Sequence, residues 1–205
     1  MLIRADFHTH SIGDGTFGEN ASDLVAAHLE AAMEAGLDCI GVTDHDDLRP
    51  GLIAVEYAQK HSLPILVIPG MEITTDDGHL VGLGLESALP RWKSMTETAS
   101  AIRDHEGISI LPHPFFPQLR ERKDVDAIER FNSRYGDFPV EENGIAIIAS
   151  SDAHSPADLH ASPYHVLVEV HELTWSAVSS AILERKVRIA VEDSSLTEQP
   201  AQTRR

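Results

Sequence analysis

Residues 2–11 read LIRADFHTHS, a short apolar strand that ends in two histidines separated by one residue. Side chains on a strand alternate between its two faces, so we expect His8 and His10 to lie on the same face. Two imidazoles on the end of a rigid strand form a two-point site for a metal ion. The pair alone is weak evidence, and its weight depends on whether later strands carry similar residues.

The rest of the chain alternates short apolar runs with helical patterns. Ser22, Pro50, Ser94 and Thr174 begin the predicted helices, and Ser94 opens a capping-box pattern with Glu97. The predicted strands are 39–43, 65–68, 80–85, 108–111, 125–131, 145–149, 166–170 and 187–191, and the strand at 65–68 is expected to end at Pro69-Gly70. This alternation predicts an α/β fold with a mainly parallel sheet, closed into a distorted barrel of fewer than eight units. One domain is expected over residues 1–193, followed by a polar, frayed tail at 194–205.

Histidines and carboxylates recur at the carboxyl ends of these strands. In a barrel those ends meet on one face, so residues far apart in sequence converge there. Mixed imidazole and carboxylate ligands suit zinc, manganese or iron, and so many candidates predict two or three ions, bridged by Glu72 and Asp152. The candidates are His8, His10, Asp14, Asp44, His45, Asp46, Glu72, His79, His113, Asp152 and His154, of which His79 precedes its strand instead of following it.

Each candidate also has an ordinary explanation. His113 stands between two prolines and could be a turn residue, residues 44–47 could be an acidic turn, and His79 could be a surface residue. Five strand junctions that all carry ligand-type residues favour a shared site. The other six histidines are expected to have ordinary core or surface roles: His28, His61, His105, His160, His165 and His171.

The amino-acid composition limits which kinds of function are possible for this chain. The formal net charge of −17 disfavours binding to long nucleic acids, whereas bound cations would still allow a small phosphorylated substrate. The single cysteine, Cys39, excludes an internal disulfide and a thiolate zinc cage. No apolar run is long enough for a membrane span, and the first residues lack a signal-peptide layout, so a cytoplasmic location is expected.

Taken together, the motifs are similar to those of one family. The chain resembles the PHP superfamily (polymerase and histidinol phosphatase) of metal-dependent phosphoesterases, and the match spans positions 6 to 154 in the family's order. The matching stretches are DFHTHS at 6–11 with Asp14-Gly15, TDHD at 43–46, PGMEI at 69–73, GHLVG at 78–82, PHP at 112–114 and SDAH at 151–154.

The resemblance implies a distorted (β/α)7-type barrel with a two- or three-metal cluster at the carboxyl ends of its strands. It implies that His45 is also a ligand, that Asp44 orients an imidazole, and that Asp14 occupies a ligand position. His79 matches a position that is a ligand in only part of the family. The remaining ligands that it implies are His8, His10, Glu72, His113, Asp152 and His154.

The expected reaction is hydrolysis of a small phosphomonoester by a hydroxide that bridges two metals, whose binding lowers the pKa of water from about 15.7 to about 7. His45 or His154 could act as the acid, and no serine or cysteine is placed for covalent catalysis. Alternatives are a phosphodiesterase or exonuclease acting on short nucleotides, a non-catalytic accessory PHP module, and a metal-dependent amidohydrolase. Candidates for holding the substrate phosphate are Arg134, Arg120, Arg122, Lys123 and Asn132.

Overall fold

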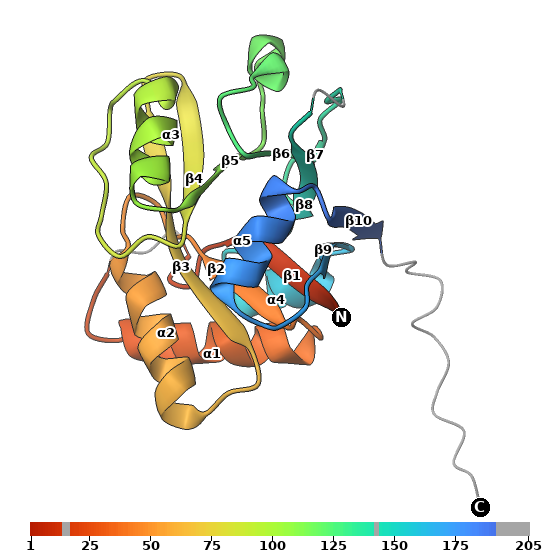
Figure 1. The fold of residues 1–205 in the computed structure, drawn as a ribbon. Coiled ribbons are helices and arrows are strands. Elements are labelled where there is room, and N and C mark those ends of the chain that lie inside the picture. Colours follow the sequence, from red (N-terminus) through yellow and green to blue (C-terminus); the bar gives the residue numbers. More distant parts are fainter. Residues whose placement is uncertain (14–16, 142–143, 192–205) are drawn as a thin grey trace, which may run out of the picture.

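The computed structural model describes residues 1–13, 17–141 and 144–191, and in this part of the chain ten strands form one curled sheet (Figure 1). The predicted tail at 194–205 lies outside the described residues. The strands are β1 (Leu2–Thr9), β2 (Cys39–Val42), β3 (Leu66–Thr75), β4 (Gly78–Leu83), β5 (Ile108–Leu111), β6 (Ala127–Asn132), β7 (Gly136–Asp137), β8 (Ala146–Ser150), β9 (Tyr164–Glu169) and β10 (Val187–Val191).

Helices cover the outside of this sheet. In Figure 1, α1 and α2 lie together beside β2 and β3, while α3 lies at the opposite end beside β4. Within the described residues none of the helices is both long enough and apolar enough to cross a bilayer. The helices are α1 (Ala21–Glu34), α2 (Arg49–His61), α3 (Met95–Asp104), the 3-10 turn η1 (Pro117–Glu121), α4 (Pro156–Ala161) and α5 (Trp175–Leu183).

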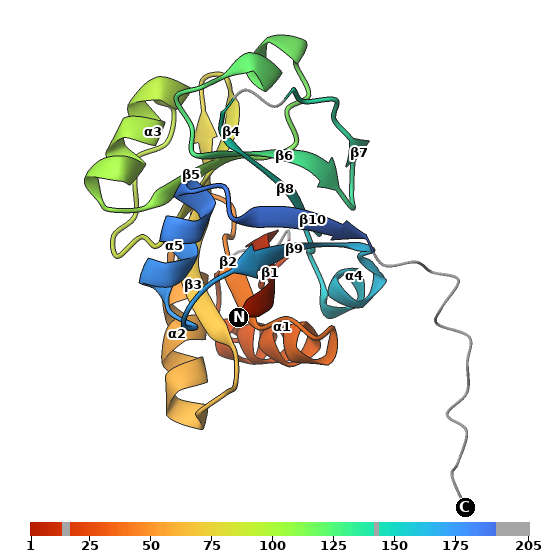
Figure 2. The ribbon, with the colours of Figure 1, turned by 45° about the vertical axis from the view of Figure 1, so that its right-hand side comes forward.

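The order of the strands curls the sheet around a common interior (Figure 2). Neighbours run β10-β9-β1-β2-β3-β4-β5-β6, and β8 pairs with the other edge of β6. Beyond the end of β8, a parallel bridge joins Ala153 to Thr9, and the His10 N–H donates to the Ala153 carbonyl at 2.7 Å. The predicted α/β barrel class is therefore confirmed, with closure at the carboxyl ends of the strands.

The sheet is less parallel than the sequence predicted. β1, β2 and β3 are parallel, as are β5, β6 and β8, but β4 is antiparallel to β3 and β5. Only two residues separate β3 from β4. So short a connection makes a hairpin, because a parallel crossover needs a dozen residues or more. β9 is likewise antiparallel to β1 and β10.

The Pro69-Gly70 step does not end the strand that precedes it, and that prediction was wrong. β3 continues to Thr75: Pro69 still pairs with Val42 of β2, whereas Gly70 pairs with Leu83 of β4. A Cβ atom at Gly70 would lie 2.5 Å from the Gly82 carbonyl oxygen, so glycine permits this close approach. Glu72 therefore lies inside a paired strand, which fixes its backbone.

The predicted helix starts were mostly correct. The Ser94 hydroxyl accepts a bond from the Glu97 N–H while the Glu97 carboxylate accepts one from the Ser94 N–H, which confirms the capping box. Thr174 likewise caps α5. The prediction for Ser22 was wrong, because α1 begins at Ala21, after an Asn20 whose side chain makes no capping bond.

The side chains of β1 stop alternating between the two faces of the sheet just before its histidines. Phe7 is fully buried in an apolar cluster with residues of β6, β8 and β9, and the next residue, His8, reaches Glu129 of β6. The pairing between β1 and β2 is irregular between Asp6 and Thr9, and such a bulge lets two consecutive side chains face the same side. The bulge therefore directs His8 into the open carboxyl end of the barrel.

Candidate metal centre

Glu72 lies at the centre of the candidate site and is fully buried. Its Oε2 atom lies 3.2 Å from His8 Nε2, 3.3 Å from His10 Nε2 and 3.0 Å from His45 Nδ1. The two Nε2 atoms of the His-x-His pair are 3.1 Å apart. The predicted same-face arrangement of this pair is therefore present, and three imidazoles converge on one carboxylate oxygen.

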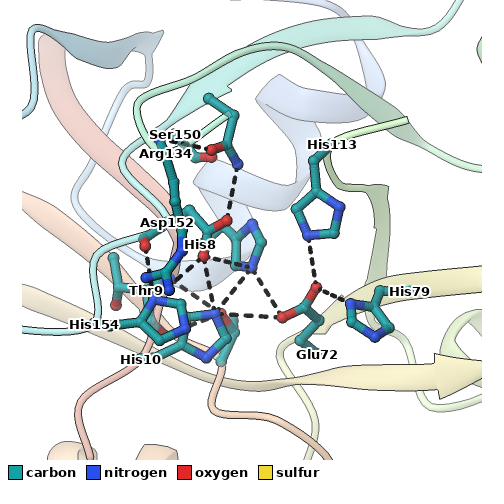
Figure 3. Close-up of polar contacts among 12 residues, drawn as sticks. His8, Thr9, His10, Glu72, His79, His113, Arg134, Ser150, Asp152 and His154 are labelled. Carbon is teal, nitrogen blue, oxygen red and sulfur yellow. Dashed lines mark hydrogen bonds and ion pairs between the residues drawn. The ribbon is translucent and has the colours of Figure 1, made fainter. Parts of the chain in front are cut away.

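The second oxygen of Glu72 has its own histidines (Figure 3). Its Oε1 atom lies 2.8 Å from His79 Nδ1 and 3.0 Å from His113 Nε2. His79 lies in β4, two residues from the position opposite Glu72, instead of preceding the strand as predicted. The antiparallel hairpin explains its reach, because it returns the chain directly alongside β3.

Asp152 approaches the same histidines from the closing edge of the barrel. Its Oδ1 atom lies 3.3 Å from His10 Nε2, 3.7 Å from His8 Nε2 and 3.6 Å from His154 Nδ1. Its backbone N–H donates to the His8 carbonyl at 3.1 Å. Asp152 and His113 both have positive φ, 54° and 27°, a costly backbone conformation of a kind that clusters at functional sites.

These contacts set the charge state of the site. Burial alone would raise the pKa of Glu72, but the surrounding imidazoles, His8 first, hold it well below its usual range. Burial opposes protonation of His8, yet Asp152, Glu72 and Glu129 together raise its pKa well above normal. Burial lowers the pKa of His45 to about 4, which leaves that imidazole neutral and able to bind a cation. A neutral imidazole is a poor acid, so His45 fits a ligand better than a proton donor.

The residues present fit a group of metal ions. Four overlapping triads have donor atoms within 4.8 Å of one another, and Glu72 belongs to two of them. Glu72 Oε2 and His10 Nδ1 are buried without a hydrogen bond, although imidazole nitrogens lie within 3.3 Å of that oxygen. Oxygen and nitrogen atoms whose lone pairs point at one another without forming hydrogen bonds have the arrangement of ligands around a cation. The triads are His10/His45/His154, His8/His10/Glu72, His8/His113/Asp152 and His45/Glu72/His79.

A residue that the sequence reasoning missed holds this cluster in place. Glu129 of β6 is fully buried, and its carboxylate accepts a 2.8 Å bond from His8 Nδ1 and a 2.8 Å bond from the His113 N–H. A carboxylate on Nδ1 leaves Nε2 of the same ring as the free donor to a metal. Little in the sequence signals this role, because Glu129 stands next to Arg130 in a predicted strand that also contains Asp126.

Two other polar side chains in this region, Asn132 and Asp44, have contacts that position their neighbours. Asn132 Nδ2 donates to Glu129 at 3.0 Å and to Asp152 at 3.1 Å, so Asn132 orders carboxylates instead of facing a substrate. Asp44 accepts bonds from the Ser11 hydroxyl and the Ile12 N–H, both at 2.9 Å. Asp44 therefore orders the loop after His10, and its expected role of orienting an imidazole stays a prediction. Asp14, further along that loop, lies outside the described residues.

The basic side chains that were predicted to bind phosphate lie at different distances from the cluster. Arg134 is close enough to His154 to help lower the pKa of that imidazole, after burial and His10, and Figure 3 draws it beside Asp152. Arg120 donates to the carbonyls of residues 114 and 115. Arg122 binds Asp124 and Thr96, away from the cluster. Lys123 is exposed near Arg120, so Arg134 alone remains a phosphate-binding candidate.

Solved structures of other proteins share the fold of this chain. A two-domain protein from Bacteroides vulgatus, described as containing a predicted PHP-like metal-dependent phosphoesterase, superposes with a TM-score of 0.73 at 21% identity over 94% of this chain. The chain has the PHP fold. It spans 65% of the length of that two-domain protein.

Two further proteins are similar. A lesion-specific endonuclease from Pyrococcus furiosus shares the PHP fold at a TM-score of 0.63 and 17% identity, over 92% of this chain and 58% of its own. An uncharacterized protein from Methanocaldococcus jannaschii is 29% identical over 157 residues, which cover 71% of this chain and 90% of that protein. No family model matches the chain.

Proposed function

We propose that this protein hydrolyses small phosphomonoesters with the help of two or three divalent metal ions. One observation carries the proposal: the described residues bring seven ligand-type imidazoles and carboxylates, from five strands and the turns that follow them, into one cluster that includes two shared carboxylates. An eighth group, the imidazole of His45, joins them. The seven are His8, His10, Glu72, His79, His113, Asp152 and His154.

The donor set indicates which metals fit. Imidazole and carboxylate ligands without thiolate suit manganese, zinc or iron. Glu72 belongs to two triads, as a bridging group does, and Asp152 belongs to one while its Oδ1 also lies 3.3 Å from His10 Nε2 and 3.6 Å from His154 Nδ1 of another. Bound ions of this kind supply a water of lowered pKa and neutralise phosphoryl oxygens. Without them, the carboxylates of the cluster would repel a phosphate.

The protein's own side chains then have separate tasks. Glu129 and Asn132 fix the orientation of His8 and Asp152, so the ligand positions exist before metal binding. Arg134 offers a planar, permanently charged guanidinium to the phosphate oxygens that do not react. We assign no general acid, because burial lowers the pKa values of both His45 and His154.

Phosphatase assays test the proposal directly. Protein loaded with Mn²⁺ should hydrolyse p-nitrophenyl phosphate, and Glu72→Gln should reduce the rate by at least about 100-fold through loss of metal, which metal analysis would detect. Glu56→Gln on the exposed face of α2 is the matched control and should retain activity. Hydrolysis of bis(p-nitrophenyl) phosphate or short oligonucleotides alone would replace the monoesterase by a diesterase, and a metal-loaded protein inactive on all three would refute the proposal.

A further inference from the structure

An aromatic wall continues outward from the candidate metal centre. The ring of Phe115 lies 5.1 Å from that of His113, the ring of Tyr135 lies 5.2 Å from it, and the two outer rings are 5.0 Å apart. Phe115 and Tyr135 remain 51% and 50% exposed. Half-exposed aromatic rings in direct contact with a candidate metal ligand therefore border the site where a phosphate would react.

The rings of the wall stand at defined angles to one another. The planes of Phe115 and Tyr135 meet at 80°, and Phe138, which is buried, supports Phe115 from behind at 5.5 Å and 81°. Phe115 thus packs against three rings while one side stays open. A right-angled corner of two rings accepts a planar group, because one ring can stack on its face while the other meets its edge.

The turn at residues 132–135 links these two aromatic rings to the part of the site where a phosphate would bind. Asn132 Oδ1 accepts bonds from the backbone N–H groups of Arg134 and Tyr135, at 3.0 and 3.1 Å, while its amide donates to Asp152. One turn therefore sets the guanidinium beside Asp152 and His154, and the phenol ring against His113. A ligand that uses both would have an anionic group at the metals and a planar group a few ångströms away.

We propose that Phe115 and Tyr135 form a stacking subsite for a nucleobase, and that the preferred substrate is a nucleoside monophosphate. The inference rests on the phosphomonoesterase function proposed above and names its substrate class. Stacking tolerates any base, because every base has a π face. The net charge of −17 favours a mononucleotide over a long strand. In the reaction water adds to phosphorus, the ester P–O bond breaks, and the leaving oxygen takes a proton to give nucleoside and inorganic phosphate.

Two substrates that differ only in the base test the subsite. The Mn²⁺-loaded protein should hydrolyse adenosine 5′-monophosphate with a kcat/KM about tenfold higher than that for ribose 5-phosphate, mainly through a lower KM. In Phe115→Ala and Tyr135→Ala this ratio should fall towards one, whereas Tyr135→Phe should preserve it. Phe116→Ala is the matched control: its side chain is 57% exposed in the same loop, and no ring contact of Phe116 is found among the described residues.

A binding measurement separates the subsite from the reaction. Calorimetric titration of adenosine and ribose into the full chain should show binding of the nucleoside alone, weakened about tenfold by Phe115→Ala, with circular dichroism confirming that each variant is folded. Equal use of both phosphates, or a ratio unaffected by either alanine variant, would overturn the subsite and leave the phosphatase standing. A preference for phenyl phosphate over the nucleotide would also overturn it. No hydrolysis of either phosphate, together with adenosine binding that depends on Phe115, would refute the phosphatase and keep the subsite.

Discussion

Replacing Glu129 with glutamine tests how the metal ligands are held. All four groups around this carboxylate are donors: His8 Nδ1 at 2.8 Å and the Ser150 hydroxyl at 2.6 Å on Oε1, and the His113 N–H at 2.8 Å and Asn132 Nδ2 at 3.0 Å on Oε2. A glutamine has one acceptor oxygen and one amide donor. If the amide takes the Oε2 position, it faces two groups that can only donate, the His113 N–H and Asn132 Nδ2. If it takes the Oε1 position, His8 Nδ1 and the Ser150 hydroxyl must both become acceptors.

The expected cost follows from this count. A buried hydrogen bond to a charged group contributes about 1.5–3 kcal/mol, so the two bonds lost in the first orientation should lower the free energy of unfolding by about 3–6 kcal/mol. If the amide faces His8, Nδ1 must accept, and the ring proton moves to Nε2. That nitrogen can then no longer bind a metal, so metal affinity should fall by about 10–100-fold.

Urea unfolding of the chelator-treated protein would measure the stability loss, and competition with a chromogenic chelator would measure the metal affinity. Ser150→Ala serves as an intermediate variant, because it removes one donor without introducing a second, and should cost about 1 kcal/mol. A Glu129→Gln protein with wild-type stability and wild-type metal affinity would refute the reasoning, since it would show that the four contacts do not orient His8.

Three further predictions concern other parts of the molecule. Arg134→Ala should raise KM for a phosphomonoester about tenfold. The control is Arg122→Ala, which should leave KM unchanged because the Arg122 guanidinium lies away from the cluster. Equal effects of the two substitutions on KM would exclude a phosphate contact by Arg134. Burial lowers the pKa of His28 to about 3, so the unfolded chain takes up a proton at this residue before the folded chain does. The free energy of unfolding should therefore fall as the pH drops from 6.5 towards 3, by up to about 1.4 kcal/mol per pH unit. His28→Leu should flatten this pH dependence in urea titrations, and an unchanged slope would contradict the prediction. Gly70→Ala should lower the melting temperature by several degrees or more, because its Cβ would lie 2.5 Å from the Gly82 carbonyl oxygen, and a neutral effect in calorimetry would show that the strands can separate there.

The parts of the site that sequence could predict are those set by local geometry. Strand periodicity and the rule that carboxyl ends of barrel strands meet on one face were enough to group His8, His10, Glu72 and Asp152. Both statements depend on chain order and strand direction alone. The structure links these four residues through contacts of 3.7 Å or less.

What the sequence could not predict depends on contacts between strands. Glu129 looks like a surface residue until β6 is placed opposite His8, and only then does its burial make sense. The continuation of β3 past Pro69-Gly70 depends on β4 being available as a new partner. The hydrogen bonds of Asp44 could not be predicted for the same reason, because its partners belong to a loop more than thirty positions earlier in the chain.

The bridge between Thr9 and Ala153 has a consequence for the order in which the site is built during synthesis. Two of the four ligand triads, His8/His10/Glu72 and His45/Glu72/His79, use only the first 79 residues of the chain. The other two need Asp152 or His154, so a nascent chain holds half of the triads long before the remainder can close over them. Contacts of such long sequence separation form late in folding. The carboxyl-terminal third of the chain must therefore leave the ribosome before the remaining two triads can form.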